Sequence, residues 1–376
     1  MKRAIQMLGA LALVAGFFTL GAPAAHAQTV PTCNSVSSVN MKWPADGTTP
    51  QTTHMFLCTS ISQQRLNGLL GTYQSLVAVV PQNLRPGNIL DNQNVFVFHF
   101  RDRNEANAYF QNTSPWSSHS GFVTTTARCG NTAYFFLPNG TYGIAIATYD
   151  RCTIGGVVQS PQSSTQLAAT ALHEAGHGYD FAIAAGQSSG PGTNAPSLSS
   201  GYVNLAKATS TGDLDKLTPP TWATMTQAQK NSYVCNIFSN LTPSSLEVDL
   251  GASAGAVCES GGSGLQIKTA YQGMTPTAIV KQKGPYFFNP AAASPPVPEF
   301  SELWAQEFAI KSQAQNPTNF LQMTNRIITT NSAPVPDFRC TRLVMQTYWD
   351  FLRPPTSNEL TAQGCSSNPG SFPQVP

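Results

Sequence analysis

The sequence predicts an α+β protein of two lobes that is stapled by disulfides. Strand-like runs of alternating apolar residues lie within residues 94–150. Helix-like runs lie within residues 163–185 and again within residues 298–351. The chain also contains eight cysteines, an even number that suits disulfide pairing in an exported protein. A mixed strand and helix lobe followed by a mainly helical lobe accounts for this order.

The predicted boundaries follow from changes in composition along the 376 residues. Residues 1–27 have the character of a signal peptide. A single large catalytic or binding domain is expected over 28–352, with a strand and helix lobe over 28–185 and a mainly helical lobe over 186–352. A tail rich in Pro, Ser and Gly is expected to be loose over 353–376.

The amino terminus predicts export. It reads "MKRAIQMLGALALVAGFFTLGAPAAHAQ", a basic start and an apolar run that end at the small residues Ala25 and Ala27. Gly21 and Pro23 interrupt the run, which favours cleavage after Ala27 over a membrane anchor. We therefore expect a secreted or periplasmic protein without a membrane span.

Charge is sparse and balanced. The loss of Lys2 and Arg3 with the signal peptide reduces the 20 basic residues by two, which matches the 18 acidic ones. Only 10% of the residues are charged, so neither a nucleic-acid surface nor a polybasic membrane patch is expected. We expect a monomer whose partner is a peptide or protein.

The cysteines predict four local disulfides. In sequence order they form pairs separated by 25, 23, 23 and 25 residues. No two cysteines form a C-x-x-C pair, which argues against a zinc cluster. The expected bridges are Cys33–Cys58, Cys129–Cys152, Cys235–Cys258 and Cys340–Cys365.

The predicted elements before residue 160 are mostly strands. Residues 28–60 are polar and are expected to form an irregular, bridged segment. "NVFVFHF" at 94–100 predicts a strand, and "RDRNEANAYFQ" after it predicts a short helix. Two further strands are expected within 132–150, joined by a tight turn at Asn139 and Gly140.

A long helix is expected next. "SSTQLAATALHEAGHGYDFAIAAG" is rich in alanine, contains no proline and begins with a capping box of Ser163 and Gln166. Gly186 marks its end, and residues 186–202 are predicted to be a flexible loop.

The remaining sequence predicts mainly helices. They are expected over 222–240, from Pro298 onward, over 316–328 and over 340–351, with a break at 260–264 and a proline-rich connection over 284–300.

The stretch "LHEAGHGYD" contains the candidate metal-binding and catalytic residues. His173 and His177 are four residues apart, so on a helix they project from the same face and can converge on one zinc ion (Zn2+). Glu174 lies beside the first histidine, where its carboxylate can act as the general base toward a zinc-activated water. The pattern H-E-x-x-H is typical of zinc metalloproteases.

A third zinc ligand must come from elsewhere in the chain. No histidine follows His177, so a glutamate on a second helix is the alternative. Glu299, Glu302 and Glu307 lie on the helix that is expected to begin near Pro298. On a helical wheel Glu307 lies within the apolar face and Glu302 lies opposite it, which by itself favours Glu307, because a buried carboxylate needs a partner.

"HEAGHGYD" followed by "SELWAQEFA" resembles the gluzincin group that contains anthrax lethal factor and Pro-Pro endopeptidases. Their pattern is H-E-x-G-H-x-x-D and then a helix with E-x-x-A-E-x-F. The resemblance covers only these two segments and implies a zincin-like fold. It also implies that Glu302 is the zinc ligand and that Gln306 replaces the second acid of the pattern. A glutamine can still accept a hydrogen bond from a ligand histidine.

The resemblance also raises two questions of detail. The group places an oxyanion-stabilising tyrosine seven residues before the ligand glutamate, a position that Pro295 occupies here. Tyr286 is the nearest upstream tyrosine. Asp180, on the same helix as the histidines, is expected to support the structure through hydrogen bonds or to be solvated rather than to bind the metal.

The expected function is therefore that of a secreted zinc-dependent endopeptidase, a hydrolase of peptide bonds. By resemblance, an extended substrate would lie along an edge strand of the hairpin at 134–150. The alternative is a non-catalytic, disulfide-rich binding or surface protein in which the H-E-x-x-H motif is structural or decayed.

Overall fold

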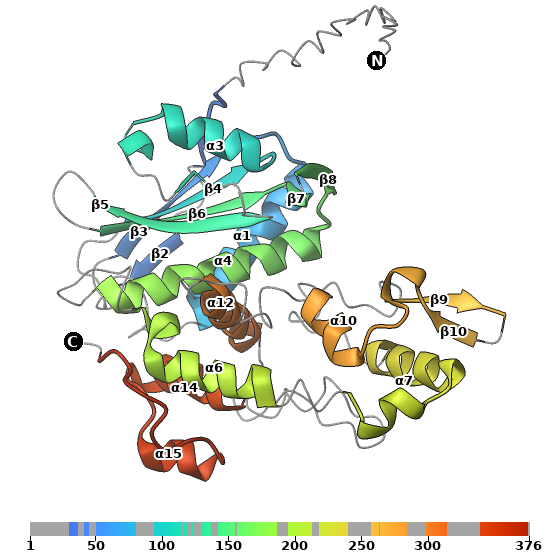
Figure 1. Ribbon diagram of the computed structural model, residues 1–376. Helices are drawn as coiled ribbons and strands as arrows, with labels where there is room; N and C mark the ends of the chain where they lie inside the picture. The colour runs from blue at the N-terminus through green and yellow to red at the C-terminus, as the bar shows by residue number, and fades with distance from the viewer. Residues whose placement is uncertain are drawn as a thin grey trace, which may run out of the picture.

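Six strands of the first lobe form one mixed sheet (Figure 1). Their order is β1-β3-β4-β6-β5, and β2 also pairs with β3. The three central strands β3 (Pro50–Leu57), β4 (Asn94–Phe100) and β6 (Tyr142–Tyr149) run parallel to one another. β5 (Gly130–Phe136) runs antiparallel to β6 at the end of the order. β1 (Asn34–Ser35) and β2 (Met41–Pro44) pair antiparallel with β3.

The computed structural model describes the following parts of the chain: residues 30–36, 41–44, 50–79, 94–114, 116–118, 122–123, 129–136, 142–154, 156–185, 195–212, 218–239, 257–262, 264–283, 298–313 and 339–374. The chain is a mixed α and β protein, as the sequence predicts. Among the described residues, no helix has the length and apolar character that are needed to cross a bilayer.

The sheet is buried on both faces, and β4 shows why. Its side chains alternate between two apolar clusters, with Val95 and Val97 on one face and Phe98 and Phe100 on the other. The second face packs against α3 (Arg103–Asn112) through edge-on and tilted aromatic rings. The predicted strand and short helix are confirmed, and the strand carries no polar face because both of its sides are covered.

The first face of the sheet is covered by α1 (Gln63–Val79) and α4 (Ser164–Ala185), as Figure 1 shows. The predicted capping box at the start of α4 is confirmed. The Gln166 N–H donates to Ser163 Oγ at 3.2 Å, and the Ser163 N–H donates to Gln166 Oε1 at 2.9 Å. This reciprocal cap fixes where α4 begins, and therefore which of its side chains face the sheet.

The second lobe contributes α12 (Pro298–Gln313), which packs across α4, together with α6 (Ser200–Gly212) and α14 (Arg339–Phe351). Farther from α4 lie α7 (Gln227–Ser239), α10 (Pro276–Lys283) and a hairpin of β9 (Cys258–Gly261) and β10 (Gly264–Ile267) (Figure 1). A second hairpin of β7 (Arg151–Ile154) and β8 (Val157–Pro161) precedes α4. The helices that were predicted to begin near residues 298 and 340 are confirmed, whereas the one over 316–328 lies outside the described residues.

All four predicted disulfides are confirmed, and each closes a local loop. They join Cys33 to Cys58, Cys129 to Cys152, Cys235 to Cys258 and Cys340 to Cys365. No cysteine is left free.

Three expectations about irregular segments were wrong in part. Residues 28–60 contain strands β1, β2 and β3, which are held by pairing with one another and with β4 rather than by any local apolar pattern. Within the expected loop at 186–202, residues 196–198 form a 3-10 turn, and α6 already begins at Ser200. Within the expected break at 260–264, Ser260, Gly261 and Gly264 lie in the paired strands β9 and β10.

The carboxyl-terminal tail is ordered, contrary to the prediction that it is loose. It contains α15 (Ser357–Ala362). Thr356 and Glu359 form a full capping box at the start of this helix. The Tyr348 hydroxyl donates to the Pro373 carbonyl at 2.5 Å, and the Gly201 N–H donates to the Ser371 carbonyl at 2.9 Å. This tail, rich in Pro, Ser and Gly, is therefore held by tertiary contacts, which its composition does not reveal.

Candidate metal centre

Helix α4 presents two imidazoles side by side. His173 and His177 lie one turn apart, and their ring centroids are 5.0 Å apart. Their side chains are only 12% and 11% exposed, so the rings lie in the interface between α4 and the second lobe rather than on the surface.

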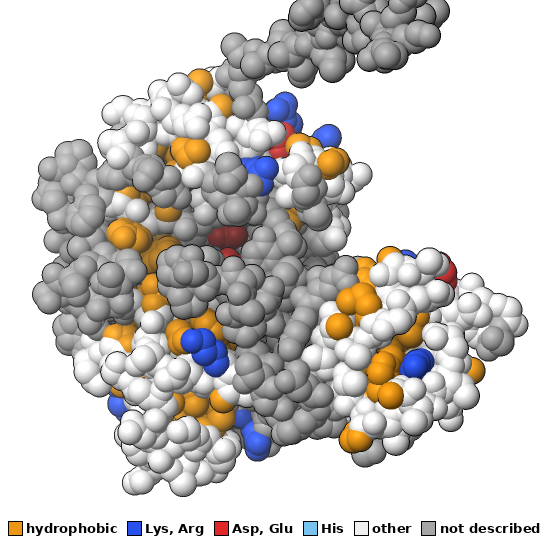
Figure 2. Space-filling model, in the orientation of Figure 1, with side chains coloured by type: hydrophobic (Ala, Val, Ile, Leu, Met, Phe, Trp, Pro, Cys, Tyr) orange, Lys and Arg blue, Asp and Glu red, His pale blue; other side chains and the backbone are white. Residues whose placement is uncertain are grey.

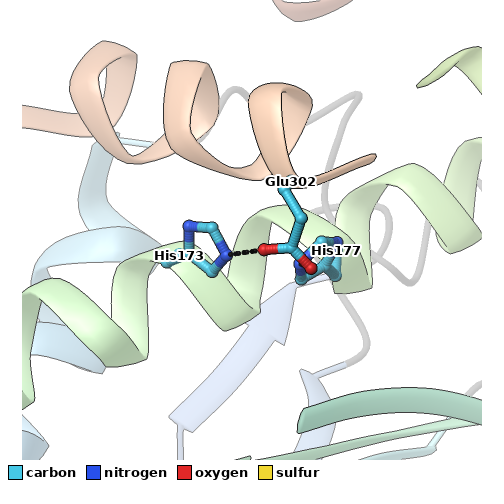
Figure 3. A group of neighbouring side chains, drawn as sticks. All are labelled: His173, His177 and Glu302. Atoms are coloured by element: carbon cyan, nitrogen blue, oxygen red, sulfur yellow. Dashed lines mark hydrogen bonds and ion pairs between the residues drawn. The ribbon is translucent and has the colours of Figure 1, made fainter. Parts of the chain in front are cut away.

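Helix α12 brings Glu302 to these two rings (Figure 3). The distance between His173 Nε2 and Glu302 Oε2 is 2.9 Å, and that between His177 Nε2 and Glu302 Oε1 is 3.5 Å. One potential ligand atom from each residue lies within 4.8 Å of the other two. Two segments that are far apart in sequence therefore meet at one point.

The spacing of these atoms suits a metal ion. In a tetrahedral zinc site with bonds of about 2.1 Å, neighbouring ligand atoms lie roughly 3.4 Å apart. The 2.9 and 3.5 Å separations are close to that value. Two imidazole nitrogens and one carboxylate are also ligand types that zinc accepts, with a fourth position left for water or substrate. The His-His-Glu group could therefore hold a metal ion.

Electrostatics favour the ionised form of Glu302. Its burial raises its pKa, but His177 and His173 together outweigh the burial and leave the pKa well below its ordinary value. The lowered pKa keeps Glu302 an ionised carboxylate beside the two rings.

Gln306 orients the first histidine. His173 Nδ1 lies 3.1 Å from Gln306 Oε1, one turn after Glu302 on α12. An amide oxygen can only accept, so Nδ1 carries the hydrogen and Nε2 presents its lone pair to Glu302. Two lone-pair atoms at 2.9 Å repel each other unless a proton or a cation lies between them, and this tautomer is the one that a metal-binding His173 requires.

A glycine lets the two helices approach closely enough. A Cβ added to Gly176 would lie 2.7 Å from both the Cα and the carbonyl oxygen of Ala305. Both are backbone atoms, which cannot move aside as a flexible side chain could. Any larger residue at 176 would push α12, and with it Glu302, away from the histidines.

Glu174 points in a different direction, toward edge strand β5. Its carboxylate Oε2 accepts a hydrogen bond from the Thr132 hydroxyl at 2.8 Å. A Cβ on Gly130 would lie 2.4 Å from Glu174 Oε1. The lack of a side chain at Gly130 therefore provides the space for the carboxylate. Burial raises the pKa of Glu174, while His177, His173 and the Thr132 hydroxyl act against this rise. We call Gly130, Thr132 and Glu174 the carboxylate seat.

The two other candidate ligands have different outcomes. Glu307 is fully buried but lies away from the histidines, because Tyr202 Oη donates to its Oε2 at 2.9 Å and Thr341 Oγ1 donates to its Oε1 at 2.5 Å. The helical-wheel argument correctly identified a buried carboxylate with partners, but these are hydroxyls rather than a metal. The side chain of Glu299 lies outside the described residues.

Asp180 supports the second lobe through hydrogen bonds. It is buried and accepts from the backbone N–H of Ser197 at 3.0 Å and from the Ser197 hydroxyl. Burial raises the pKa of Asp180 to about 6, against the lowering effect of these two bonds. The expected supporting role suits this geometry, in which the aspartate ties the end of α4 to the 3-10 turn before α6.

Two of the predicted details cannot be placed, and two residues were missed. Tyr286 and Pro295 lie outside the described residues. Thr132 and Gly130 were not singled out, because nothing in the local sequence of β5 shows that it lies beside Glu174. Only the tertiary packing of β5 against α4 reveals that contact.

Figure 2 shows acidic side chains recessed near the centre of one face of the molecule, whereas the Lys and Arg side chains on that face are scattered. No protein-family model, curated protein or solved structure matches this chain. The case for a function therefore rests on the geometry of the site.

Proposed function

We propose that this chain is a zinc-dependent endopeptidase with a zincin-like fold, similar to the gluzincin group of anthrax lethal factor and Pro-Pro endopeptidases. The observation that carries the proposal is the position of Glu302, whose carboxylate lies 2.9 and 3.5 Å from the two histidine nitrogens of the H-E-x-x-H helix. In this proposal His173, His177 and Glu302 hold the zinc. When bound there, zinc would polarise the scissile carbonyl and acidify a water molecule.

Glu174 supplies the proton transfers. Its carboxylate would accept a proton from the attacking water and then donate it to the amine that leaves, so it serves first as base and then as acid. Burial in the interface raises its pKa, which makes it a stronger base than an exposed carboxylate. Gln306 would hold His173 in the tautomer that keeps Nε2 free of hydrogen.

Strand β5 is suited to align the substrate. The Tyr149 N–H donates to the Cys129 carbonyl, so the alternation of an antiparallel pair directs the backbone groups of Cys129, Asn131 and Ala133 toward β6. The backbone groups of Gly130 and Thr132 then point to the outer side of β5. An extended peptide that pairs with this side would pass next to Glu174. Within the hairpin expected to bind substrate, β5 is thus the strand that offers an edge.

The remaining parts of the proposal concern context. We propose that the protein is exported, is cleaved after Ala27 and acts as a monomer on unfolded polypeptides. Four disulfides suit an oxidising compartment.

The test combines metal content with proteolysis. The purified mature protein is expected to hold one zinc per chain by mass spectrometry and to cleave fluorescein-labelled casein. The Glu174→Gln variant is expected to keep the zinc and to lose at least about 100-fold in rate, because the base is gone while the ligands remain. Glu259→Gln, on an exposed residue of β9, is the matched control and should cleave normally.

Each outcome separates the two candidate functions. A protein that stays free of zinc at micromolar zinc would contradict the proposal. Zinc binding without cleavage of any unfolded polypeptide would instead support a non-catalytic exported protein with a structural metal.

A further inference from the structure

The carboxylate seat contains a hydroxyl that is placed between two acceptors of the same residue. Thr132 Oγ1 lies 2.8 Å from Glu174 Oε2 and 2.9 Å from the Glu174 backbone oxygen. A threonine hydroxyl has one hydrogen, so it donates to one of these oxygens at a time and can accept a bond from the other direction.

We propose that Thr132 is a positioning residue for Glu174, because its hydroxyl binds one carboxylate oxygen and so fixes the orientation of the group. This inference rests on the endopeptidase function proposed above, and it assigns a role to a residue of the edge strand rather than of the motif helix.

The Thr132 hydroxyl donates to Oε2 of the Glu174 carboxylate, which fixes one oxygen and leaves Oε1 free of this bond. Such a bond matters more at a buried site, where no solvent replaces it, and Glu174 is only 6% exposed.

The same hydrogen bond is kept through the proton transfers. In the proposed reaction the proton of the water goes to Oε1, the oxygen that Thr132 does not bind, and then passes from Oε1 to the leaving amine. Oε2 remains an acceptor throughout, so the Thr132 hydroxyl keeps donating to it and neither gains nor loses a proton.

Gly130 completes the seat. A side chain at this position would occupy the space of Glu174 Oε1, since its Cβ would lie 2.4 Å from that oxygen and 2.7 Å from the carboxylate carbon. The two residues therefore act on the two oxygens separately. Gly130 makes room for one, and Thr132 binds the other.

Thr132→Val tests the inference, because valine keeps the shape and the strand preference of threonine but removes the hydroxyl. With labelled casein as substrate, kcat is expected to fall about 10- to 100-fold, whereas KM stays within about twofold. Zinc content and the affinity for zinc should not change, because Thr132 touches no ligand. Thr132→Ser is expected to restore kcat to within about threefold of the wild type, because it restores the hydroxyl.

Two further variants guard against a loss of folding. Thr148→Val removes a buried hydroxyl from β6 that bonds to His99 at 3.0 Å, and it should leave kcat unchanged. Gly130→Ala should lower kcat while zinc content is kept, because it displaces the carboxylate rather than the ligands. Melting temperatures identify any variant that is merely unfolded.

The outcomes distinguish this inference from the function on which it rests. Equal kcat for Thr132→Val and wild type, or an equally low kcat for Thr132→Ser, would overturn the role of Thr132 and leave the endopeptidase intact. A wild type that neither binds zinc nor cleaves casein would overturn both.

Discussion

Gln306 is one residue at which this chain differs from the gluzincin pattern to which its sequence was compared. An acid at this position would bring a negative charge to the ring nitrogen of the first histidine, whereas the amide brings only an acceptor oxygen at 3.1 Å. The hydrogen bond, and with it the tautomer of His173, is kept. The negative charge of an acid, which would make His173 a stronger electron-pair donor to a metal, is lost.

Removal of this acceptor is expected to weaken zinc binding. Gln306→Leu keeps the size of the side chain but leaves His173 Nδ1 without its partner, and zinc affinity should fall about 10-fold. Gln306→Glu, which keeps an acceptor and adds charge, should bind zinc at least as tightly as the wild type. Competition with a zinc-chelating dye measures both. Equal affinities for the leucine variant and the wild type would show that the hydrogen bond has no effect.

Glu307 shows what a buried carboxyl does without a metal. Burial raises its pKa to about 7, although Thr341, Arg342 and Tyr202 all act to lower it. Between the ordinary value near 4.5 and this value, the folded chain holds a proton that the unfolded chain has lost. Each rise in pH through this window therefore favours the unfolded state.

The free energy of unfolding is accordingly expected to fall between about pH 5 and pH 7, by an amount on the order of 3 kcal/mol from Glu307. Glu307→Gln has no proton to lose, and its carbonyl oxygen can still accept from one of the two hydroxyls while its NH2 group donates to the other, so its stability should depend less on pH. Urea unfolding of both proteins at pH 5, 6 and 7 gives the difference. Parallel pH profiles would contradict the assignment.

At the scale of elements, the contact between α4 and α12 determines whether the site exists. Gly176 and Ala305 meet at this crossing, and the ligands His173, His177 and Glu302 all lie within one turn of it. Small residues at the crossing thus set the distance between the two helices, and this distance sets the separation of the ligand atoms.

Gly176→Ala is expected to cost about 1–3 kcal/mol in stability, because its Cβ meets backbone atoms of α12. Zinc affinity should fall with it. Gly178→Ala is the matched control on the same helix, since its Cβ would lie 3.5 Å from Ile144, an ordinary contact. Helix propensity predicts that this control is as stable as the wild type, or up to about 1 kcal/mol more stable. Thermal melting and zinc titration of both variants check this, and a Gly176→Ala protein that matches the control would refute the argument.

The elements that the sequence predicts well are those with local signals. The start of α4 has a capping box, α12 begins at a proline, and the paired strands β5 and β6 flank the Asn139-Gly140 dipeptide in the sequence. Helix α1 was not predicted, because Gly68 and Gly71 interrupt its sequence, although Leu66, Leu69, Leu70 and Tyr73 follow a helical spacing. The residues of the candidate site also differ in how far the local sequence predicts them. The motif indicates its histidines, whereas the position of Thr132 depends on a contact between residues that are 42 apart.

At the scale of the whole molecule, the disulfides and the candidate metal centre link the chain over different distances. Every disulfide closes a loop of 23 to 25 residues. With no free cysteine, none of them joins α4 to α12. The two helices are held together by packing, and a metal ion at the candidate centre would add a further link between them.

A metal ion at His173, His177 and Glu302 would therefore be the long cross-link that the disulfides do not provide. It would close a loop of more than 100 residues, and it would bind the folded chain alone, so its binding energy would add to the stability of the fold. A chelator is expected to lower the melting temperature of the wild type by about 5 °C or more and to leave a His177→Ala variant nearly unchanged. Loss of the ion would then weaken the α4–α12 contact, so the fold would lose stability together with the metal.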